Sequence, residues 1–363
     1  GSKGREVQNG QNGNGYGLQP GGVEGDQKDD NNPGEKKTDQ GEGESGWQKH
    51  GDRKGPNGGG NGLLTGWCPG GGCKCEIAVG GQWNFKETIK DGAVFYLDPP
   101  EDRRKPWTPI ELHHEPNVHR MPWLKGAAGS FTLVVKPLRG KGSVDGVGPG
   151  LRILEYFKPE NPRRQWKTRV VSDTTHLSHN FHTVNWDQDP EEELIAASKE
   201  GVWLFDRTDG KWTKRQLTED FAGEIRDGRL PSGKRFIATV EPMHGDKAAA
   251  YVQPDKGRGL WKRLAFLDQA IQDGHALAIA DFLGVGSDQV VVGWRAMHPP
   301  GTPGIKLFTP LDKDGSTWRE TVISGKALAV EDLKAADLDG DGKPDLVAAG
   351  RQTKNLRIFF NAR

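Results

Sequence analysis

The fold is decided by one stretch near the C-terminus, Ala336-Asp337-Leu338-Asp339-Gly340-Asp341-Gly342-Lys343-Pro344-Asp345-Leu346-Val347. It places Asp337, Asp339, Asp341 and Asp345 at positions 1, 3, 5 and 9 of a glycine-rich loop. Calcium takes about 6 to 8 oxygen ligands, and glycines let a short loop curl so that carboxylates point inward. The helix-loop-helix calcium hand has a longer loop, whereas this one runs directly into an apolar, strand-like segment. The stretch therefore predicts a strand-loop-strand calcium site, and the alternative is an acidic turn that holds no ion.

The strands around this loop recur along the chain. A tryptophan begins the strand before the loop, and an apolar strand follows it at 355–361. The same order begins at Trp107, Trp166, Trp212 and Trp261 and ends with the unit at Trp318, with spacings of 59, 46, 49 and 57 residues. Periods of roughly 40 to 50 residues with about four strands each are typical of β-propeller blades. Helical periodicity is nearly absent, so we predict an all-β propeller.

The number of blades follows from counting these units. A shortened first unit begins at residue 76, and five tryptophan-led units follow it, which gives six. Propellers often close by pairing strands from both chain ends, so residues before this first unit would supply a seventh blade. We favour seven blades on that ground.

A second acidic loop is predicted in the unit that begins at Trp166. Asn185, Asp187, Asp189 and Glu193 stand at the same positions 1, 3, 5 and 9. In the unit that begins at Trp261 these positions hold one carboxylate and three residues without charge, so we expect a plain turn there. The cofactor expected in the two acidic loops is structural Ca²⁺.

Composition separates two regions and excludes some partners. Residues 1–62 are polar, charged and glycine-rich, which predicts a flexible or irregular segment before a propeller at 63–363. The 50 basic and 50 acidic residues cancel, which argues against nucleic acid as the main partner. No apolar run reaches the roughly 18 residues that span a bilayer. Cys68, Cys73 and Cys75 fit either a disulfide with one free thiol or a metal site.

Histidines stand at related points of several units. His119 and His182 each lie four residues before a tryptophan, and His275 lies six residues before Asp281. His244 follows Glu241-Pro242-Met243 at a strand end. A histidine in a strand is usually a satisfied polar residue, but imidazoles that converge from several blades would bind a divalent metal with positions left open for substrate.

Two arginines accompany these histidines. Arg120 and Arg226 would clamp a carboxylate or stabilise an enolate, although arginines more often form surface ion pairs.

These residues resemble two groups of proteins. The loop Asp337–Asp345 is similar to the calcium loops of FG-GAP (VCBS-type) repeats, found in integrin-like and bacterial propellers. The combination of Val118-His119-Arg120, His182 before the acidic loop, Glu241-Pro-Met-His244 and Gly274-His275 resembles the propeller of the aldos-2-ulose dehydratase family and its shorter bacterial relatives, from about residue 75 onward. The resemblance implies a metal-dependent dehydration of an oxidised sugar in the central cleft.

The sequence thus predicts a metal-assisted carbohydrate lyase. We expect His119, His182 and His275 to bind an axial divalent metal such as Zn²⁺, Mn²⁺ or Mg²⁺. His244 is assigned as ligand or base, Glu241 as base or support, and Arg120 as electrostatic stabiliser. Rhamnose-uronate and ulvan lyases also carry histidines in propeller clefts, so a polysaccharide lyase is one alternative. A propeller that only binds glycans or a protein partner is the other. A secreted or periplasmic location is favoured, and the oligomeric state is left open.

Overall fold

The computed structural model describes residues 63–67, 76–187, 189–255, 258–296 and 301–361. All of them belong to one compact unit. The predicted N-terminal segment 1–62 and the three cysteines lie outside the described residues, so the interpretations of both stay predictions.

The described residues form antiparallel sheets, each built from strands that are consecutive in the chain. In chain order the strands are β1 (Leu63–Trp67), β2 (Glu76–Gly81), β3 (Ala93–Asp98) and β4 (Thr108–Leu112); β5 (Val118–Arg120), β6 (Trp123–Lys125), β7 (Phe131–Pro137), β8 (Leu151–Phe157) and β9 (Lys167–Thr175); β10 (Phe181–Val184), β11 (Glu193–Ser198), β12 (Gly201–Thr208) and β13 (Lys211–Gln216); β14 (Glu224–Arg229), β15 (Arg235–Glu241), β16 (Lys247–Val252) and β17 (Lys262–Asp268); β18 (Gly274–Ala280), β19 (Gln289–Trp294), β20 (Gly304–Pro310) and β21 (Trp318–Ser324); β22 (Val330–Ala336), β23 (Asp345–Gly350) and β24 (Asn355–Phe359). A 3-10 turn, η1 (Ala127–Gly129), is the single helical element within the described residues.

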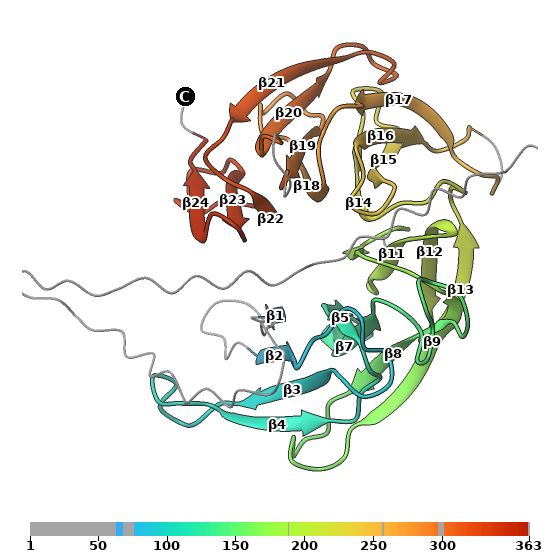
Figure 1. Cartoon of the computed structure of the whole chain (residues 1–363), viewed down its shortest axis with the longest axis vertical. Coiled ribbons are helices and arrows are strands. Elements are labelled where there is room, and N and C mark those ends of the chain that lie inside the picture. The colour runs from blue at the N-terminus through green and yellow to red at the C-terminus, as the bar shows by residue number, and fades with distance from the viewer. Residues whose placement is uncertain (1–62, 68–75, 188, 256–257, 297–300, 362–363) are drawn as a thin grey trace, which may run out of the picture. The chain divides into compact units, whose positions relative to one another are not determined.

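The sheets follow one another around a centre, with the first strand of each sheet innermost (Figure 1). This is a β-propeller, and the all-β prediction is confirmed. The residues that the structure describes make six sheets, so the count of six blades is confirmed and the favoured seventh blade is not found among them. Blades 1 to 5 have a fourth, outer strand, whereas blade 6 has three strands, β22 to β24.

The core consists of apolar layers between consecutive blades. Blade pairs 1–2, 2–3, 3–4, 4–5 and 5–6 each enclose their own cluster of buried side chains. Trp166 packs on Tyr96 across the first of these layers, with ring centroids 5.3 Å apart. Trp318 packs on Phe236 across the fourth, at 5.6 Å. Burial of large rings between sheets supplies much of the hydrophobic stabilisation of such a fold.

The recurring tryptophans mark the outer strands of blades 1 to 5. Trp166, Trp212, Trp261 and Trp318 stand at the start of β9, β13, β17 and β21 and belong to the layers between blades. Trp107 precedes β4 and instead donates its indole N–H to the carbonyl oxygen of Arg103 at 3.0 Å. The repeat read from the sequence therefore begins one strand before the blade does.

This arrangement fixes where a site can form. Since the first strand of every blade lies nearest the centre, side chains at equivalent points of β5, β10, β14, β18 and β22 converge there. In the part of the chain that the structure describes, no helix is long and apolar enough to cross a membrane.

Candidate active site

A cavity of about 720 Å³ lies at the centre of the propeller, and all six blades contribute to its wall. The wall combines four histidines, four arginines, two carboxylates, two aromatic rings and four other apolar residues. They are Gly80, Trp83, Phe85, Val118, His119, Arg120, Leu138, Arg139, His179, Met243, His244, His275, Arg295, Glu331, Asp332 and Arg351. These residues lie at the start of innermost strands or in loops that follow second strands, which are at the same end of the blades. The cavity therefore belongs to one end of the propeller.

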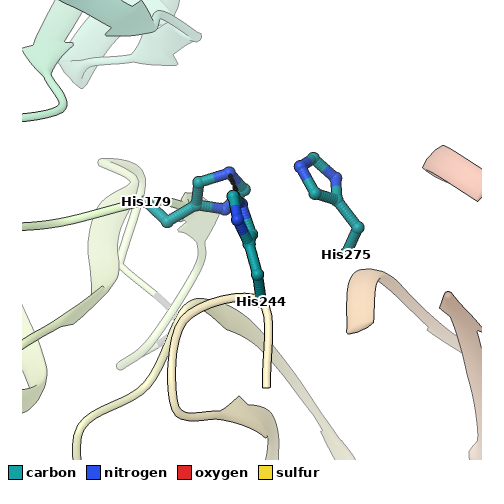
Figure 2. Close-up of side chains that lie close together, drawn as sticks. All are labelled: His179, His244 and His275. Carbon is teal, nitrogen blue, oxygen red and sulfur yellow. Dashed lines mark hydrogen bonds between the residues drawn. The ribbon is translucent and has the colours of Figure 1, made fainter. Parts of the chain in front are cut away.

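Three histidines from three blades meet in this cavity. His179 precedes β10, His244 lies in the turn between β15 and β16, and His275 is at the start of β18 (Figure 2). Each offers one ring nitrogen within 4.8 Å of the others. The Nε2 atoms of His179 and His244 are 3.0 Å apart. The ring of His275 lies 4.7 Å from each of the other two, measured between centroids.

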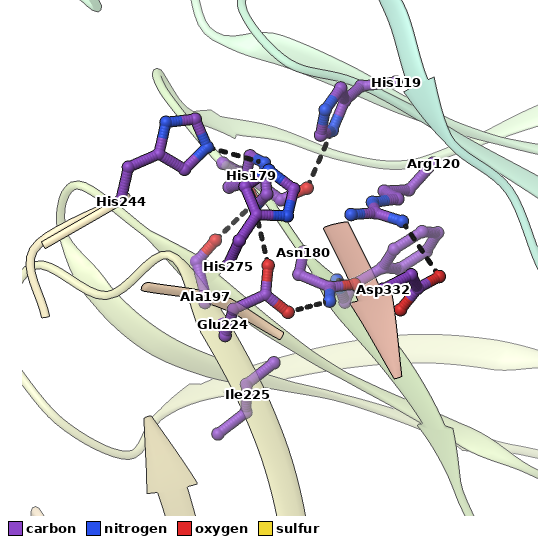
Figure 3. A network of polar contacts seen from close by, with 12 residues as sticks. His119, Arg120, His179, Asn180, Ala197, Glu224, Ile225, His244, His275 and Asp332 are labelled. Atoms are coloured by element: carbon purple, nitrogen blue, oxygen red, sulfur yellow. Dashed lines mark hydrogen bonds and ion pairs between the residues drawn. The ribbon is translucent and has the colours of Figure 1, made fainter. Parts of the chain in front are cut away.

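Hydrogen bonds on the far side of two rings fix their tautomers. His179 Nδ1 lies 2.7 Å from Glu224 Oε1 (Figure 3). His275 Nδ1 lies 2.7 Å from the carbonyl oxygen of Glu331. Both acceptors require an N–H donor, so the proton sits on Nδ1 and Nε2 keeps its lone pair. Glu224 is itself held by the side chain amide of Asn180. A carboxylate or carbonyl behind the ring is the usual support of a metal-bound histidine.

The cluster favours neutral imidazoles. Burial lowers the pKa of His179 and of His275 well below 6.5, and neighbouring cations such as Arg295 act in the same direction. Burial also lowers the pKa of His244 to about 4. Neutral imidazole is the form that binds a metal ion. Three such nitrogens around one point fit a divalent metal such as Zn²⁺ or Mn²⁺.

His119 and Arg120 lie beside this cluster on β5. The His119 ring is 4.7 Å from that of His179, and its Nδ1 donates to the carbonyl oxygen of His179 at 2.8 Å. That oxygen also accepts from the ammonium of Lys136 at 3.3 Å. Arg120 reaches Asp332 on β22, with a nitrogen-to-oxygen distance of 3.7 Å (Figure 3). Both predicted residues thus line the cavity, but His119 is outside the group of three.

Two other predicted site residues lie elsewhere. His182 is on β10, where its Nε2 lies 3.8 Å from Asp227, and it is absent from the cavity wall. Glu241 ends β15 and accepts hydrogen bonds from Thr239 at 2.7 Å and Tyr251 at 2.6 Å. Its carboxylate is buried in a network within blade 4 and does not reach the cavity. Of the predicted site residues, the cavity wall therefore contains His119, Arg120, His244 and His275. His182 and Glu241 lie outside it.

The sequence reading missed His179, although a signal for it exists. His179 lies six residues before Asn185, the first position of its acidic loop, and His275 lies six before Asp281. Glu331, also in the wall, lies six before Asp337. Counting six residues back from the first position of each acidic loop therefore finds the residues that line the cavity. The sequence prediction instead selected His182 because it lies four residues before a tryptophan, as His119 does. That spacing does not identify equivalent positions, because Trp123, the tryptophan after His119, belongs to the separate strand β6.

The two acidic loops lie at the opposite end of the innermost strands. One joins β22 to β23 and brings carboxylate oxygens of Asp337, Asp339 and Asp345 within 4.8 Å of one another. The Asp341 carboxylate instead accepts from the backbone N–H of Lys343 at 2.9 Å and from its ammonium at 2.8 Å.

The other acidic loop joins β10 to β11. It brings Asp187, Asp189 and Glu193 equally close, while Asn185 donates its side-chain amide to the carbonyl oxygen of Asp189 at 2.7 Å. Glu193 Oε1 is buried without a hydrogen-bond partner among the described residues, and burial raises the pKa of this carboxyl to about 8. A buried oxygen without a partner is costly unless a cation or proton is present.

The third copy of the loop, between β18 and β19, is held by its own hydrogen bonds. Asp281 accepts from the backbone N–H groups of Val285 at 2.9 Å and Gly286 at 2.7 Å. Gln289 accepts from Leu283 N–H at 2.9 Å. The groups of three or more possible metal ligands among the described residues do not include Asp281.

Comparison with known proteins identifies a relative among the carbohydrate-acting dehydratases. No protein-family model matches the chain. The chain is 23% identical over 269 residues to aldos-2-ulose dehydratase of Phanerodontia chrysosporium, and the alignment covers 64% of this chain and 29% of the relative. The chain therefore spans less than a third of the length of that protein. The resemblance to this dehydratase is confirmed: the chain is a six-bladed β-propeller with sequence similarity to aldos-2-ulose dehydratase.

Proposed function

We propose that this protein is a metal-dependent carbohydrate lyase that eliminates water from an oxidised sugar, such as an aldos-2-ulose or anhydrofructose, in its central cavity. The observation that carries the proposal is the convergence of His179, His244 and His275 inside that cavity. The name of the relative, a dehydratase, supports the reaction class.

In this proposal the three histidines would hold the metal through one ring nitrogen each. A metal held there would supply Lewis-acid polarisation of the sugar carbonyl, which makes the neighbouring C–H bond more acidic. Glu224 and the Glu331 carbonyl keep the His179 and His275 rings oriented through Nδ1. His244, which the sequence left as ligand or base, is assigned as a ligand because its Nε2 faces that of His179.

His119 is assigned as the proton acceptor. Its Nδ1–H is donated to the His179 carbonyl, so its Nε2 carries a lone pair. The C–H bond next to the carbonyl breaks and its proton passes to this Nε2. The C–O bond at the following carbon then breaks, and the departing hydroxide takes up the proton and leaves as water. Arg120 supplies positive charge near the oxygen that becomes negative.

Two aromatic side chains on the blade 1 side of the cavity suit a sugar. Trp83 lies 5.8 Å from the His119 ring, and Phe85 lies 6.2 Å from Trp83, measured between centroids. Both line the cavity. Aromatic faces in a pocket bind the apolar face of a ligand while polar groups orient it. We therefore assign these two rings to sugar binding.

A second candidate is a polysaccharide lyase acting on a uronate-containing glycan. The observation that favours it is the excess of cations in the wall, where Arg120, Arg139, Arg295 and Arg351 accompany Glu331 and Asp332. Guanidinium groups recognise carboxylates with two parallel hydrogen bonds. This candidate uses the same metal and proton-transfer residues.

We propose further that the two acidic loops hold structural Ca²⁺. Their convergent carboxylates and the unpartnered Glu193 oxygen support this assignment. The loops lie at the other end of the propeller from the histidines, so this role is structural.

The proposed function is tested by following the ultraviolet absorbance of the unsaturated product. The substrates are 1,5-anhydrofructose, glucosone and a rhamnose-uronate oligosaccharide, with wild type and His119→Ala in each case. Turnover of one substrate, reduced at least about 100-fold in His119→Ala, supports the assignment. The control is His176→Ala, which removes a half-exposed histidine paired with Glu200 on the propeller surface. A wild-type protein that binds these sugars without turning them over would favour a binding propeller.

A further inference from the structure

The guanidinium group of Arg120 lies in the cavity wall without a hydrogen bond to the described residues. Its side chain is only 15% exposed, and its Nε is buried without an acceptor. The carboxylate that lies nearest among the described residues, on Asp332, is 3.7 Å from Nη1, which is an ion pair but too long for a hydrogen bond (Figure 3). Arginine has several N–H donors, and a group so far removed from water normally has partners for them. The terminal donors of Arg120 are therefore available to a ligand in the cavity.

The other three arginines of the wall differ from Arg120. Arg295 donates through three of its nitrogens to two carboxylates, at 2.8 to 3.1 Å. Arg139 donates to a backbone carbonyl oxygen at 3.1 Å. The side chain of Arg351 is 43% exposed, so water can satisfy its donors. Within the described wall, Arg120 is thus the largely buried guanidinium group whose terminal donors the protein leaves unused.

A β-bulge on β5 presents Arg120 and His119 to the cavity together. Val118 pairs with Pro137 of β7, and Arg120 pairs with Lys136, so two steps along β5 match one step along β7. His119 is the extra residue. Consecutive side chains of a regular strand point to opposite faces, whereas a bulge changes the direction of one of them. Both side chains line the cavity as a result.

The charges of the cavity wall favour an anionic ligand. The wall contains four arginines and two carboxylates, so its formal charge without a metal is 4 − 2 = +2. A guanidinium group binds a carboxylate through parallel N–H donors, and such charge-assisted hydrogen bonds are about twice as strong as neutral ones. The proposed ligand of this cavity is a sugar. A sugar that carries a carboxylate would use the free donors of Arg120.

We propose that the substrate is a sugar acid whose carboxylate binds the terminal nitrogens of Arg120, and that His119 takes the proton from the carbon next to that carboxylate. This inference rests on the proposed function and names its substrate class. Because Arg120 directly follows His119 in the chain, one backbone segment holds both the carboxylate and the proton acceptor.

The reaction is an elimination beside the carboxylate. The C–H bond next to the carboxylate breaks, and its proton passes to Nε2 of His119. The electron pair forms a C=C bond to the following carbon, where the C–O bond breaks. The oxygen leaves with that electron pair and takes up the proton that His119 accepted. Negative charge grows on the carboxylate oxygens as the C–H bond breaks, and this is the charge that Arg120 stabilises.

The test compares acids with matched neutral sugars by calorimetric titration of the full-length protein loaded with zinc and calcium. D-glucuronate and D-glucose form one pair, because glucose has a hydroxymethyl group in place of the carboxylate. The rhamnose-uronate oligosaccharide and its carboxyl-reduced form are the other pair. Wild type is expected to bind the acid of a pair at least about 10-fold more tightly. Arg120→Gln should lose this preference. Arg120→Lys keeps the charge but not the planar donors, so it should retain part of it.

Arg319→Gln is the matched control, since Arg319 is exposed on the outer strand β21 and its loss should leave the preference unchanged. His119→Ala should keep the preference for the acid and lose turnover, because it removes the proton acceptor alone. Equal binding of acid and neutral sugar by wild type, or binding of neither, overturns the inference. A preference that persists in Arg120→Gln belongs to another group and also overturns it.

Turnover separates this inference from the proposed function. If wild type turns over a neutral sugar and shows no preference for acids, the lyase function stands and the sugar-acid inference falls. If an Arg120-dependent preference for acids is found but no sugar is turned over, the carboxylate site is supported and the lyase function is contradicted.

Discussion

His179 and His244 face each other through their Nε2 atoms at 3.0 Å. Because the Nδ1 proton of His179 is committed to Glu224, its Nε2 has only a lone pair to present to His244. Without a metal ion, a neutral His244 can carry its proton on Nε2 and donate it to this lone pair. Burial lowers the pKa of both rings, which disfavours a second proton and a charged imidazolium. With the His244 proton on Nδ1 instead, both Nε2 atoms offer lone pairs to one metal ion.

In the metal-free protein, the contribution of His244 to stability should decrease as the pH falls. Burial lowers the pKa of His244 from 6.5 to about 4, so between these values the unfolded chain binds more protons at this residue than the folded chain. The contribution of His244 to the free energy of unfolding is therefore largest above about pH 6.5 and decreases as the pH falls toward 4. We expect a loss on the order of 2 kcal/mol from this group. Urea unfolding in EDTA at several pH values measures it.

His244→Asn is the matched variant for this measurement. His244 has a φ of 56°, a left-handed conformation that asparagine tolerates better than most residues. The variant should show a weaker pH dependence across the same window. An identical slope in the two proteins would show that His244 does not titrate as described.

Glu193→Gln should separate the calcium-bound state from the empty state of the β10–β11 loop. The pKa of Glu193 is raised to about 8, so without calcium the carboxyl is largely protonated at pH 7 and glutamine resembles it. In chelator the two proteins should have similar Tm values. With calcium, wild type should melt several degrees higher and the variant should gain less.

Asp339→Ala tests the β22–β23 loop in the same way, and Asp281→Ala in the third copy is the control that should not change the response to calcium. A wild-type Tm that is equal in calcium and chelator would rule out structural calcium in both acidic loops.

Trp261→Ala should destabilise the fold strongly. Trp261 is 4% exposed and lies in the apolar layer between blades 3 and 4, where its neighbour Trp186 is 5.6 Å away between ring centroids. Removal of such a ring costs about 3–5 kcal/mol through lost burial and the cavity left behind. Trp107→Ala is the comparison, because Trp107 lies outside these layers and should cost clearly less. Equal losses in denaturant unfolding would contradict the assignment of the layers.

The fold was predictable because its repeat is carried by local patterns. A tryptophan at the head of each outer strand and an acidic loop after an innermost strand recur with blade-like spacing, as at Trp166 and Asn185. The point at which each blade begins was not predictable in the same way, because a tryptophan can begin any of the four strands of a blade. The favoured seventh blade rested on chain closure rather than on a strand pattern.

The histidine site was only partly predictable, because the pairing register of the innermost strands decides which residues reach the cavity. His182 pairs with Ile195, and Lys334, at the same place in blade 6, pairs with Val347. The residues three positions earlier, His179 and Glu331, are the ones that reach the cavity. Glu241 looked functional from its proximity to His244 in sequence, yet it ends a second strand and points into a network within the blade.

The central claim is that His179, His244 and His275 share one metal ion, and metal binding measures this most directly. The protein is stripped with EDTA, reloaded with Zn²⁺ in the presence of calcium, and analysed for zinc by elemental analysis. Wild type should bind one Zn²⁺ at the cluster, and each of His179→Ala, His244→Ala and His275→Ala should weaken binding at least about 10-fold. His182→Ala, which changes a histidine on β10 three residues after His179 and outside the cluster, should keep its zinc. Full zinc content in His179→Ala, or its loss in His182→Ala alone, would contradict the account.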